Sequence, residues 1–308
     1  KLPIDKVGLV LLIVWDPALQ IMLDEGKDHD WFESTRIVTL AIIAAIGFVA
    51  FLIWELTERN PVVDLRVFRH RGYRTSMLTL SLGFGAFFGI TVLTPLWLQI
   101  YMGYTATIAG YSTAMMGILA VFLAPLIANL ATKIDPRPMV FIGVLWLGGW
   151  TLYRSHANMD MTFWQISFPM FFQGIGMPLF FVPLTGIALG SVLAREMESA
   201  AGLMNFIRTL SGAVATSMVN TGWERETRYV RAELAGLTDR AGDTTQAMQM
   251  AGAGEQSKGT LEWLLQGQSV MVATNKIFMI IAVLFFVAAF AIWLAPRPKT
   301  QVDTSVVH

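Results

Sequence analysis

Residues 277–295 read IFMIIAVLFFVAAFAIWLA, a run without a single charged side chain. An α-helix needs about 20 mostly apolar residues to cross the roughly 30 Å hydrocarbon core of a bilayer. The run does not alternate between apolar and polar residues, as the strands of a membrane β-barrel do. It therefore predicts a membrane-spanning helix.

Similar runs recur along the whole chain. We expect eight spans in all, and the other seven are 7–23, 37–54, 77–100, 107–131, 138–153, 163–193 and 200–220. Of the 308 residues, 55% are hydrophobic and 14% are charged, whereas a soluble domain has roughly 25% charged residues. The sequence therefore predicts an all-α integral membrane protein built as a helix bundle.

Basic residues concentrate in the connections on one side of these spans. That side carries Lys1, Lys6, Arg59, Arg66, Arg69, Arg71, Arg74, Lys133, Arg137, Arg195, Arg297 and Lys299. The short connections on the other side carry only Lys27, Arg36 and Arg154. Because cytoplasmic loops carry the excess of lysine and arginine, we expect both termini of the chain in the cytoplasm.

The long connection 221–276 is then expected outside the membrane. Residues 223–234 are typical of a charged amphipathic helix, Ala251–Gly254 interrupts the structure, and Leu261–Leu265 begins a second, weakly apolar helix. Two interpretations stay open for this loop. It is either a solvated connector or a docking surface for a partner outside the membrane.

Several functional classes find no support in the sequence. There is no phosphate-binding Gly-Lys-Thr or Gly-Lys-Ser loop, and no pair of histidines on one helix. Cysteine is absent, and the four histidines lie in expected loops or at the terminus. The 22 basic and 22 acidic residues cancel, which argues against a nucleic-acid partner. We expect neither an enzyme nor a bound metal or cofactor.

Arg208 is a charged residue inside the expected span 200–220. Such a charge costs about 2.5 to 3.5 kcal/mol on insertion scales, so it usually faces protein or water. Helical spacing places it on one stripe with Ala201, Asn205, Gly212 and Ala215. Arg208 either bonds neighbouring carbonyls or a carboxylate, or it holds an anion or tunes the pKa of a carboxylate.

Asp16 is the only acid well inside an expected span, and Pro17 follows it. Proline loosens the local helix and disfavours the α conformation of the preceding residue. An intramembrane acid can carry a proton, but Asp-Pro can equally mark a simple break. Glu55, at the end of the second span, is expected only at the membrane interface.

Aromatic residues cluster at Phe84, Phe87 and Phe88 and at Phe171, Phe172, Phe180 and Phe181. Such residues commonly face lipid or the protein core. If some line a cavity, they suit bulky apolar ligands and aromatic cations, with a few polar groups beside them. The candidate cavity residues are Phe88, Phe172, Phe181, Gln99, Gln173 and Thr185.

Several segments resemble the EmrB/QacA branch of the major facilitator superfamily, and in particular its EmrB type. They are 19–27, 54–68, 103–110, 183–185 and 205–212. The resemblance covers essentially the whole chain. Members of this branch have fourteen helices: a six-helix bundle, an extra hairpin and a second six-helix bundle.

The resemblance implies that this chain is the hairpin and the second bundle, with Lys1 an internal start. We expect a hairpin at 1–56, a cytoplasmic linker at 57–76, a six-helix bundle at 77–295 and a cytoplasmic tail at 296–308. Spans 77–100 and 163–193 would line the central cavity. Span 200–220 would face the N-terminal six-helix bundle, which is missing here.

The resemblance also implies inner-membrane export of hydrophobic and cationic drugs by alternating access. The proton motive force would drive it, and a periplasmic adaptor and an outer-membrane channel would be partners. Transport candidates are Arg208, Asn205 and Asp16, although Asp16 has no counterpart in the family. Residues 129–137 resemble a degenerate gating loop, which makes Asp135 and Arg137 candidates for a cytoplasmic gate. The alternative is a non-transporting scaffold that docks a partner through the outer loop.

Overall fold

The computed structural model describes residues 5–58, 61–158, 160–240 and 255–296, apart from the side chains of 237–240 and 255–261. These residues form helices and no strand, which confirms the predicted all-α class. The helices are α1 (Lys6–Glu25), α2 (Thr35–Thr57), α3 (Arg71–Ile100), α4 (Ala106–Ala131), α5 (Pro136–Arg154), α6 (Phe163–Gln173), α7 (Gly176–Gly190), α8 (Met197–Arg240) and α10 (Glu255–Ala291). Short 3-10 turns are η1 (Trp31–Glu33), η2 (Leu65–Arg69), η3 (Ala194–Glu196) and η4 (Ile292–Leu294).

Helix starts follow from local capping residues. The carboxylate of Asp5 accepts the backbone N–H groups of Val7 and Gly8 at the start of α1. Asp135 caps α5 in the same way, and Pro136 follows at the first helical position. Side-chain oxygens at these positions satisfy backbone donors that have no partner within the helix.

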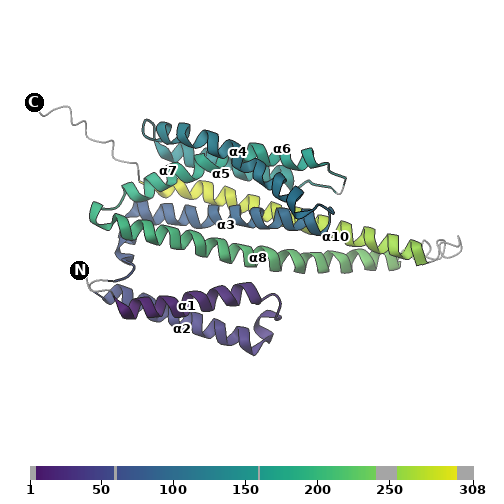
Figure 1. Cartoon of the computed structure of the whole chain (residues 1–308), viewed down its shortest axis with the longest axis horizontal. Coiled ribbons are helices and arrows are strands. Elements are labelled where there is room, and N and C mark those ends of the chain that lie inside the picture. The colour runs from purple at the N-terminus through teal and green to yellow at the C-terminus, as the bar shows by residue number, and fades with distance from the viewer. Residues whose placement is uncertain (1–4, 59–60, 159, 241–254, 297–308) are drawn as a thin grey trace, which may run out of the picture.

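The first two helices form a hairpin that lies along α8 (Figure 1). Gly47 of α2 lets the chain approach Trp15, because a Cβ there would lie 2.7 Å from that of Trp15. The Trp15 ring lies 5.7 Å from the ring of Phe206 in α8. Further along, the Ser217 hydroxyl of α8 donates to the carbonyl of Leu23.

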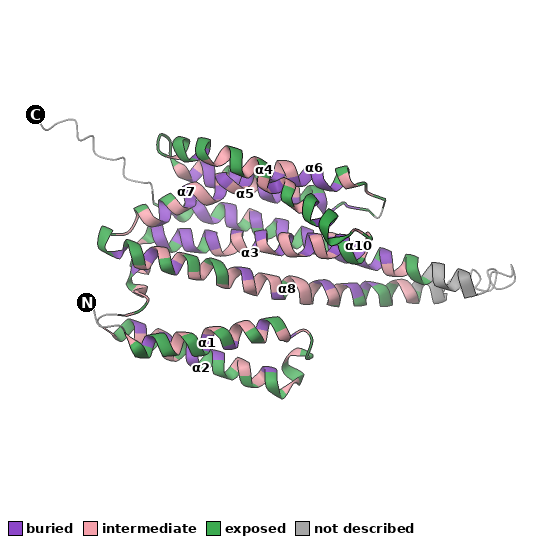
Figure 2. Cartoon of the chain, in the orientation of Figure 1, coloured by how far each residue is buried: buried purple, intermediate pink, exposed green. Residues whose placement is uncertain are grey.

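The remaining helices form one bundle with α3 and α10 at its centre. Figure 1 shows α8 on one side of this pair and α4 to α7 on the other. Figure 2 shows burial concentrated on α3, α10 and α5, while the hairpin is largely exposed. Large apolar side chains such as Phe122, Ile46 and Phe290 are exposed at 64% or more, as expected of surfaces that face lipid rather than water.

Six of the described helical segments are long and apolar enough to cross a membrane. One span differs from the prediction. The expected span 163–193 is broken at Gly174 and Ile175 into α6 and α7. The span expected at 7–23 is continuous, because α1 runs through Pro17 to Glu25, so Asp16-Pro17 does not mark a simple break.

The expected outer loop 221–276 is also wrong in part. Residues 223–234 do not form a separate helix, because α8 continues without interruption to Arg240. Likewise α10 begins at Glu255 and runs on into the apolar run that starts at Ile277. The two helices therefore extend past the rest of the bundle as a helical stalk (Figure 1). The expected break at 251–254 and most of the tail 296–308 lie outside the described residues.

Candidate functional site

An aromatic cavity of about 420 Å³ lies between α3, α7 and α8. It is lined by Phe84, Phe87, Phe88, Met177, Phe181, Arg208 and Thr209. The three phenylalanines of α3 share one face because residues three and four apart are neighbours on a helix. Phe181 of α7 meets Phe84 edge-on, with ring centres 5.6 Å apart. The rings thus form an apolar wall of fixed geometry.

Arg208 supplies the one charged side chain among the described residues that line this cavity. Its guanidinium lies 5.6 Å from the centre of the Phe84 ring, within the range of a cation–π interaction. The side chain is exposed, and the described residues offer it no hydrogen bond or ion pair. Asn205 is exposed one turn earlier on α8 but does not line the cavity.

Small and polar residues bring α8 close enough to α3 to close one side of the cavity. A Cβ on Gly212 would lie 3.3 Å from the ring of Phe88. The hydroxyls of Ser81 and Ser211 are 2.7 Å apart and share a hydrogen bond. Gly212, one member of the small-residue stripe beside Arg208, therefore packs against α3.

Two predicted cavity residues, Phe88 and Phe181, lie in the lining. Gln99 and Thr185 do not. Gln99 is exposed near the end of α3 and donates to the carbonyl of Pro95. The Thr185 hydroxyl donates to the carbonyl of Phe181, so its polar group is used within α7.

Phe172 belongs to a different surface, so its predicted place in the cavity is wrong. Its ring stacks on Trp150 of α5 at 5.5 Å with an interplanar angle of 14°. Trp150 and Phe168 line a second, apolar groove of about 930 Å³ between α5 and α6. The residues that line it carry no charge.

Gln173 is also misplaced by the sequence prediction, because its side chain is buried in the bundle. Its amide nitrogen donates to the hydroxyl of Thr151 at 2.9 Å and to the carbonyl of Leu147 at 3.3 Å. Its oxygen accepts from Arg154, which the sequence places in an outer loop. Arg154 is instead only 6% exposed. No local signal in the sequence marks Arg154 as buried, because arginine is common just beyond the end of an apolar span.

Asp16 lies on α1 beside the hairpin core. One carboxylate oxygen accepts from the amide of Gln20 at 3.0 Å, and the other is shielded from solvent and has no hydrogen-bond partner. The neighbouring Trp15 contacts Phe206 of α8. Asp16 therefore lies away from the described cavity lining, although its helix, α1, packs along α8.

Asp135 and Arg137 pair at the start of α5, with a closest N–O distance of 2.8 Å. Arg137 also donates to the carbonyl of Ala295 and lies 5.9 Å from the ring of Trp293. The pair therefore joins the start of α5 to the η4 segment that follows α10.

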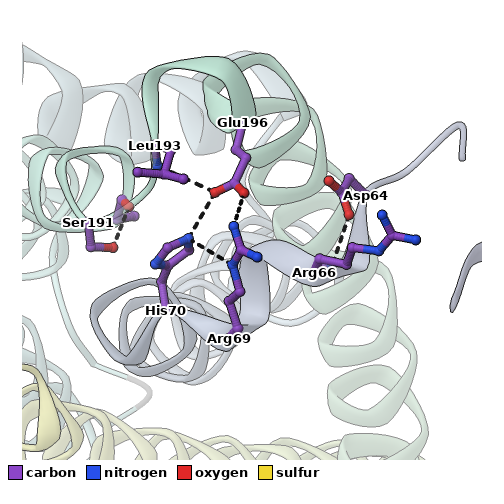
Figure 3. Close-up of polar contacts among 8 residues, drawn as sticks. Asp64, Arg66, Arg69, His70, Ser191, Leu193 and Glu196 are labelled. Atoms are coloured by element: carbon purple, nitrogen blue, oxygen red, sulfur yellow. Dashed lines mark hydrogen bonds and ion pairs between the residues drawn. The ribbon is translucent and has the colours of Figure 1, made fainter. Parts of the chain in front are cut away.

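A second ionic cluster joins the linker to the start of α8 (Figure 3). Glu196 is 7% exposed and accepts from Arg69, from the backbone of Leu193 and from the Nε2–H of His70 at 2.8 Å. Desolvation acts to raise the pKa of Glu196, but the hydrogen bonds from His70 and Leu193 and the charge of Arg69 outweigh it and lower that pKa. Glu196 thus stays ionised at neutral pH.

Glu55, near the end of α2, is buried with 0% exposure. One oxygen accepts from the backbone N–H of Val63 at 3.1 Å, and the other has no partner. Gly8 lies against it, since a Cβ there would be 2.6 Å from the Glu55 oxygen. This carboxyl ties the hairpin to the linker that leads into α3.

The stalk is held together by contacts between α8 and α10. The indole of Trp223 donates to the hydroxyl of Thr274 at 2.9 Å. Arg231 pairs with Glu262 at 2.9 Å. Beside these contacts the large aromatic side chains of Tyr229 and Trp263 are each 64% exposed.

Comparison with known proteins identifies the family to which this chain is similar. The family model described as "Major Facilitator Superfamily" matches residues 9–216. The fatty acid resistance protein FarB of Neisseria gonorrhoeae is 37% identical over 304 residues, which cover 97% of this chain and 60% of that protein. The multidrug export protein EmrB of Escherichia coli strain K12 is 37% identical over 303 residues, which cover 96% and 59%.

More distant matches agree. The colistin resistance protein EmrB of Acinetobacter baumannii is 23% identical, with 96% of this chain and 60% of that protein covered. A crystal structure of a bacterial Spinster homologue, inward-facing and occupied, superposes with a TM-score of 0.52 at 17% identity, covering 86% of this chain and 60% of that one. The chain thus spans about 60% of the length of the curated relatives that it matches. It belongs to the Major Facilitator Superfamily and is EmrB-like within it.

Proposed function

We propose that this chain is the C-terminal portion of a proton-coupled multidrug exporter that works by alternating access. The observation that carries the proposal is the aromatic cavity between α3, α7 and α8, with Arg208 at its edge. Ligand sites in proteins are commonly apolar and aromatic, with few polar groups that orient the ligand. The names of the relatives, multidrug export and fatty acid resistance, support the same assignment.

The cavity would be completed by the N-terminal six-helix bundle. Arg208 and Thr209 line the cavity and are exposed. A half-site of this kind fits transporters in which two bundles rock about a ligand held between them. Because the described lining holds no acid, an acidic partner for cationic drugs would have to come from the other bundle.

The proton motive force would drive export without a cofactor. Asp16 is the candidate proton carrier in this chain, because it is an acid inside a membrane span with one unpartnered, shielded oxygen. Asn205 and Arg208 are the polar groups of α8 that would face the moving bundle. Asp135 and Arg137 would lie at the gate on the side that we predict to be cytoplasmic.

The stalk of α8 and α10 would dock a periplasmic adaptor, which in turn would recruit an outer-membrane channel. Exposed Tyr229 and Trp263 are the anchors that favour this role, since aromatic residues are enriched in protein interfaces. The same observation supports the alternative function, a non-transporting membrane scaffold that binds a partner through the stalk.

Reconstitution of the full-length protein separates these functions. In liposomes with an imposed pH gradient, the exporter should move a fluorescent hydrophobic drug toward the acidic side, and collapse of the gradient should stop it. Drug movement at the same rate with and without the pH gradient would contradict proton coupling. A folded full-length protein that binds the adaptor but moves no drug would favour the scaffold.

A further inference from the structure

Four hydrogen bonds connect the break between α6 and α7 to α5. The indole of Trp146 donates to the carbonyl of Phe172 at 2.7 Å. Gln173, the last residue of α6, donates from its amide to the carbonyl of Leu147 and to the hydroxyl of Thr151, and it accepts from Arg154. The backbone polar groups freed at a helix break need such partners within a membrane. Here α5 bonds one backbone carbonyl at the break, that of Phe172, and the adjoining side chain of Gln173.

Arg154 is the member of this network that reaches furthest. One terminal nitrogen donates to Gln173 at 3.3 Å, and the other donates to the hydroxyl of Thr94 in α3 at 2.6 Å. The guanidinium also lies 4.7 Å from the centre of the Phe278 ring in α10. A single buried side chain of α5 therefore contacts α3, α6 and α10 at once.

All of these partners are neutral. Within the residues that the structure describes, no carboxylate pairs with Arg154, although it is only 6% exposed. A buried charge with neutral partners is unfavourable unless its hydrogen bonds are well placed. Polar networks in a low dielectric specify one arrangement of the groups that they join. The planar fork of arginine suits this task because it fixes two acceptors in defined directions.

The helix that follows the break forms part of the cavity. Met177 lies four residues beyond Gln173, and Phe181 lies one further turn along α7. On the other arm, Thr94 belongs to the same helix as Phe84 and Phe88. Gly174 lets the break pack tightly, since a Cβ there would overlap the carbonyl oxygen of Met116 in α4. The direction of α7 therefore depends on how the break is held.

We propose that Arg154 is a positioning residue that holds the α6–α7 break and so sets how Met177 and Phe181 line the cavity. It would shape drug selectivity without touching drug. The proposal rests on the proposed function in taking the cavity as part of the drug path. The following labelling test, however, needs no transport.

Single cysteines report the two walls separately, because this chain has no cysteine of its own. In full-length protein freed of other cysteines, Met177→Cys reports α7 and Phe84→Cys reports α3. Adding Arg154→Met should change the maleimide labelling rate at position 177 by at least about threefold, a typical size for coupling between contacting networks. The rate at position 84 should stay within error.

Arg154→Lys keeps the charge but cannot hold Thr94 and Gln173 in the same fork. It should give an intermediate rate at position 177, and it preserves the test if Arg154→Met fails to fold. Equal changes at positions 84 and 177 would indicate general loosening and overturn the proposal. Unchanged labelling at position 177 in either folded variant would overturn it as well. Loss of transport by the unmutated protein would count against the proposed function only.

Discussion

The guanidinium of Arg208 lies 5.6 Å from the centre of the Phe84 ring, across the boundary between α8 and α3. The contact places the positive charge of Arg208 over an aromatic ring of the cavity, while the arginine side chain remains exposed. An arginine that would be costly in lipid thus has an aromatic partner and a cavity beside it.

Replacing Arg208 with alanine in the full-length protein should weaken drug export. A cation–π contact at an exposed site is worth about 0.5 to 1 kcal/mol, so we expect the apparent KM for drug to rise roughly twofold to fivefold. Initial efflux rates over a range of drug concentrations measure this change. Arg74→Ala, at an exposed arginine near the start of α3, serves as control. Unaltered efflux at normal expression would remove Arg208 from the mechanism.

Asp16→Asn should uncouple transport from the proton gradient while preserving drug binding. The amide keeps the size of the carboxyl and can still bond Gln20, but it cannot take up a proton. Drug accumulation driven by an imposed pH gradient should fall strongly, whereas equilibrium drug binding should not. Asp28→Asn, in the exposed outer turn of the hairpin, is the matched control. Gradient-driven transport at the normal rate would exclude Asp16 as the proton carrier.

Glu196→Gln should destabilise the protein in a pH-dependent way. A carboxyl whose pKa is lowered on folding contributes stability that is present above its ordinary pKa and is lost as the pH falls through the lowered value. The Tm of the variant in detergent should therefore lie below that of the wild type near pH 7, by about 2–4 °C for each 1 kcal/mol lost. The difference should shrink below about pH 4. Glu198→Gln, at an exposed position nearby, should show no such dependence.

Two glycines of α5 should respond oppositely to alanine. A Cβ at position 143 would lie 2.8 Å from the backbone carbon of Leu179, whereas a Cβ at position 149 would meet nothing within 4 Å. Gly143→Ala should thus force α5 and α7 apart and cost about 1–3 kcal/mol. Gly149→Ala should be neutral or slightly stabilising, because alanine favours the helix. Thermal unfolding of the two purified variants compares them, and equal Tm values would refute the tight α5–α7 contact.

Replacing Tyr229 and Trp263 together with serine should impair adaptor binding but not membrane insertion. Both rings are exposed on the stalk, so their loss removes a contact surface and little internal packing. Capture of a purified periplasmic adaptor by the full-length variant measures the loss. Tyr111→Ser, at another exposed ring on α4, is the control. Undiminished capture would place the docking surface elsewhere.

The sequence predicts most of the helices because membrane spans are long and apolar. Searching only for long apolar runs also explains which helix bounds it predicts wrongly. Residues 221–240 are too charged to be a span, yet they continue α8 because Trp223 and Val230 bury against neighbouring helices. In the expected span 163–193, Gly174 and Gly176 weaken the helix locally, but glycine also occurs inside continuous spans. The break there depends on contacts from α4 and α5, which are distant in sequence.

The candidate site was predictable where a charge stands out against its own helix or where aromatic residues cluster. Arg208 is the charge, Phe88 and Phe181 belong to the clusters, and all three line the cavity. Gln173 also stands out, but a polar residue in a span can face a buried partner as readily as a cavity. Its partner Arg154 sits at a span end, where arginine is unremarkable, so only the tertiary structure shows that it is buried.

Because α8 is one uninterrupted helix, a tilt at the cavity would also move its far end in the stalk. Arg208 and Arg240 belong to one helix, 32 residues apart, which corresponds to about 48 Å at 1.5 Å per residue. A tilt of about 5° near the cavity would therefore displace the far end of the stalk by about 4 Å. Rearrangement around a bound molecule and the position of anything docked on the stalk would then be parts of one rigid movement.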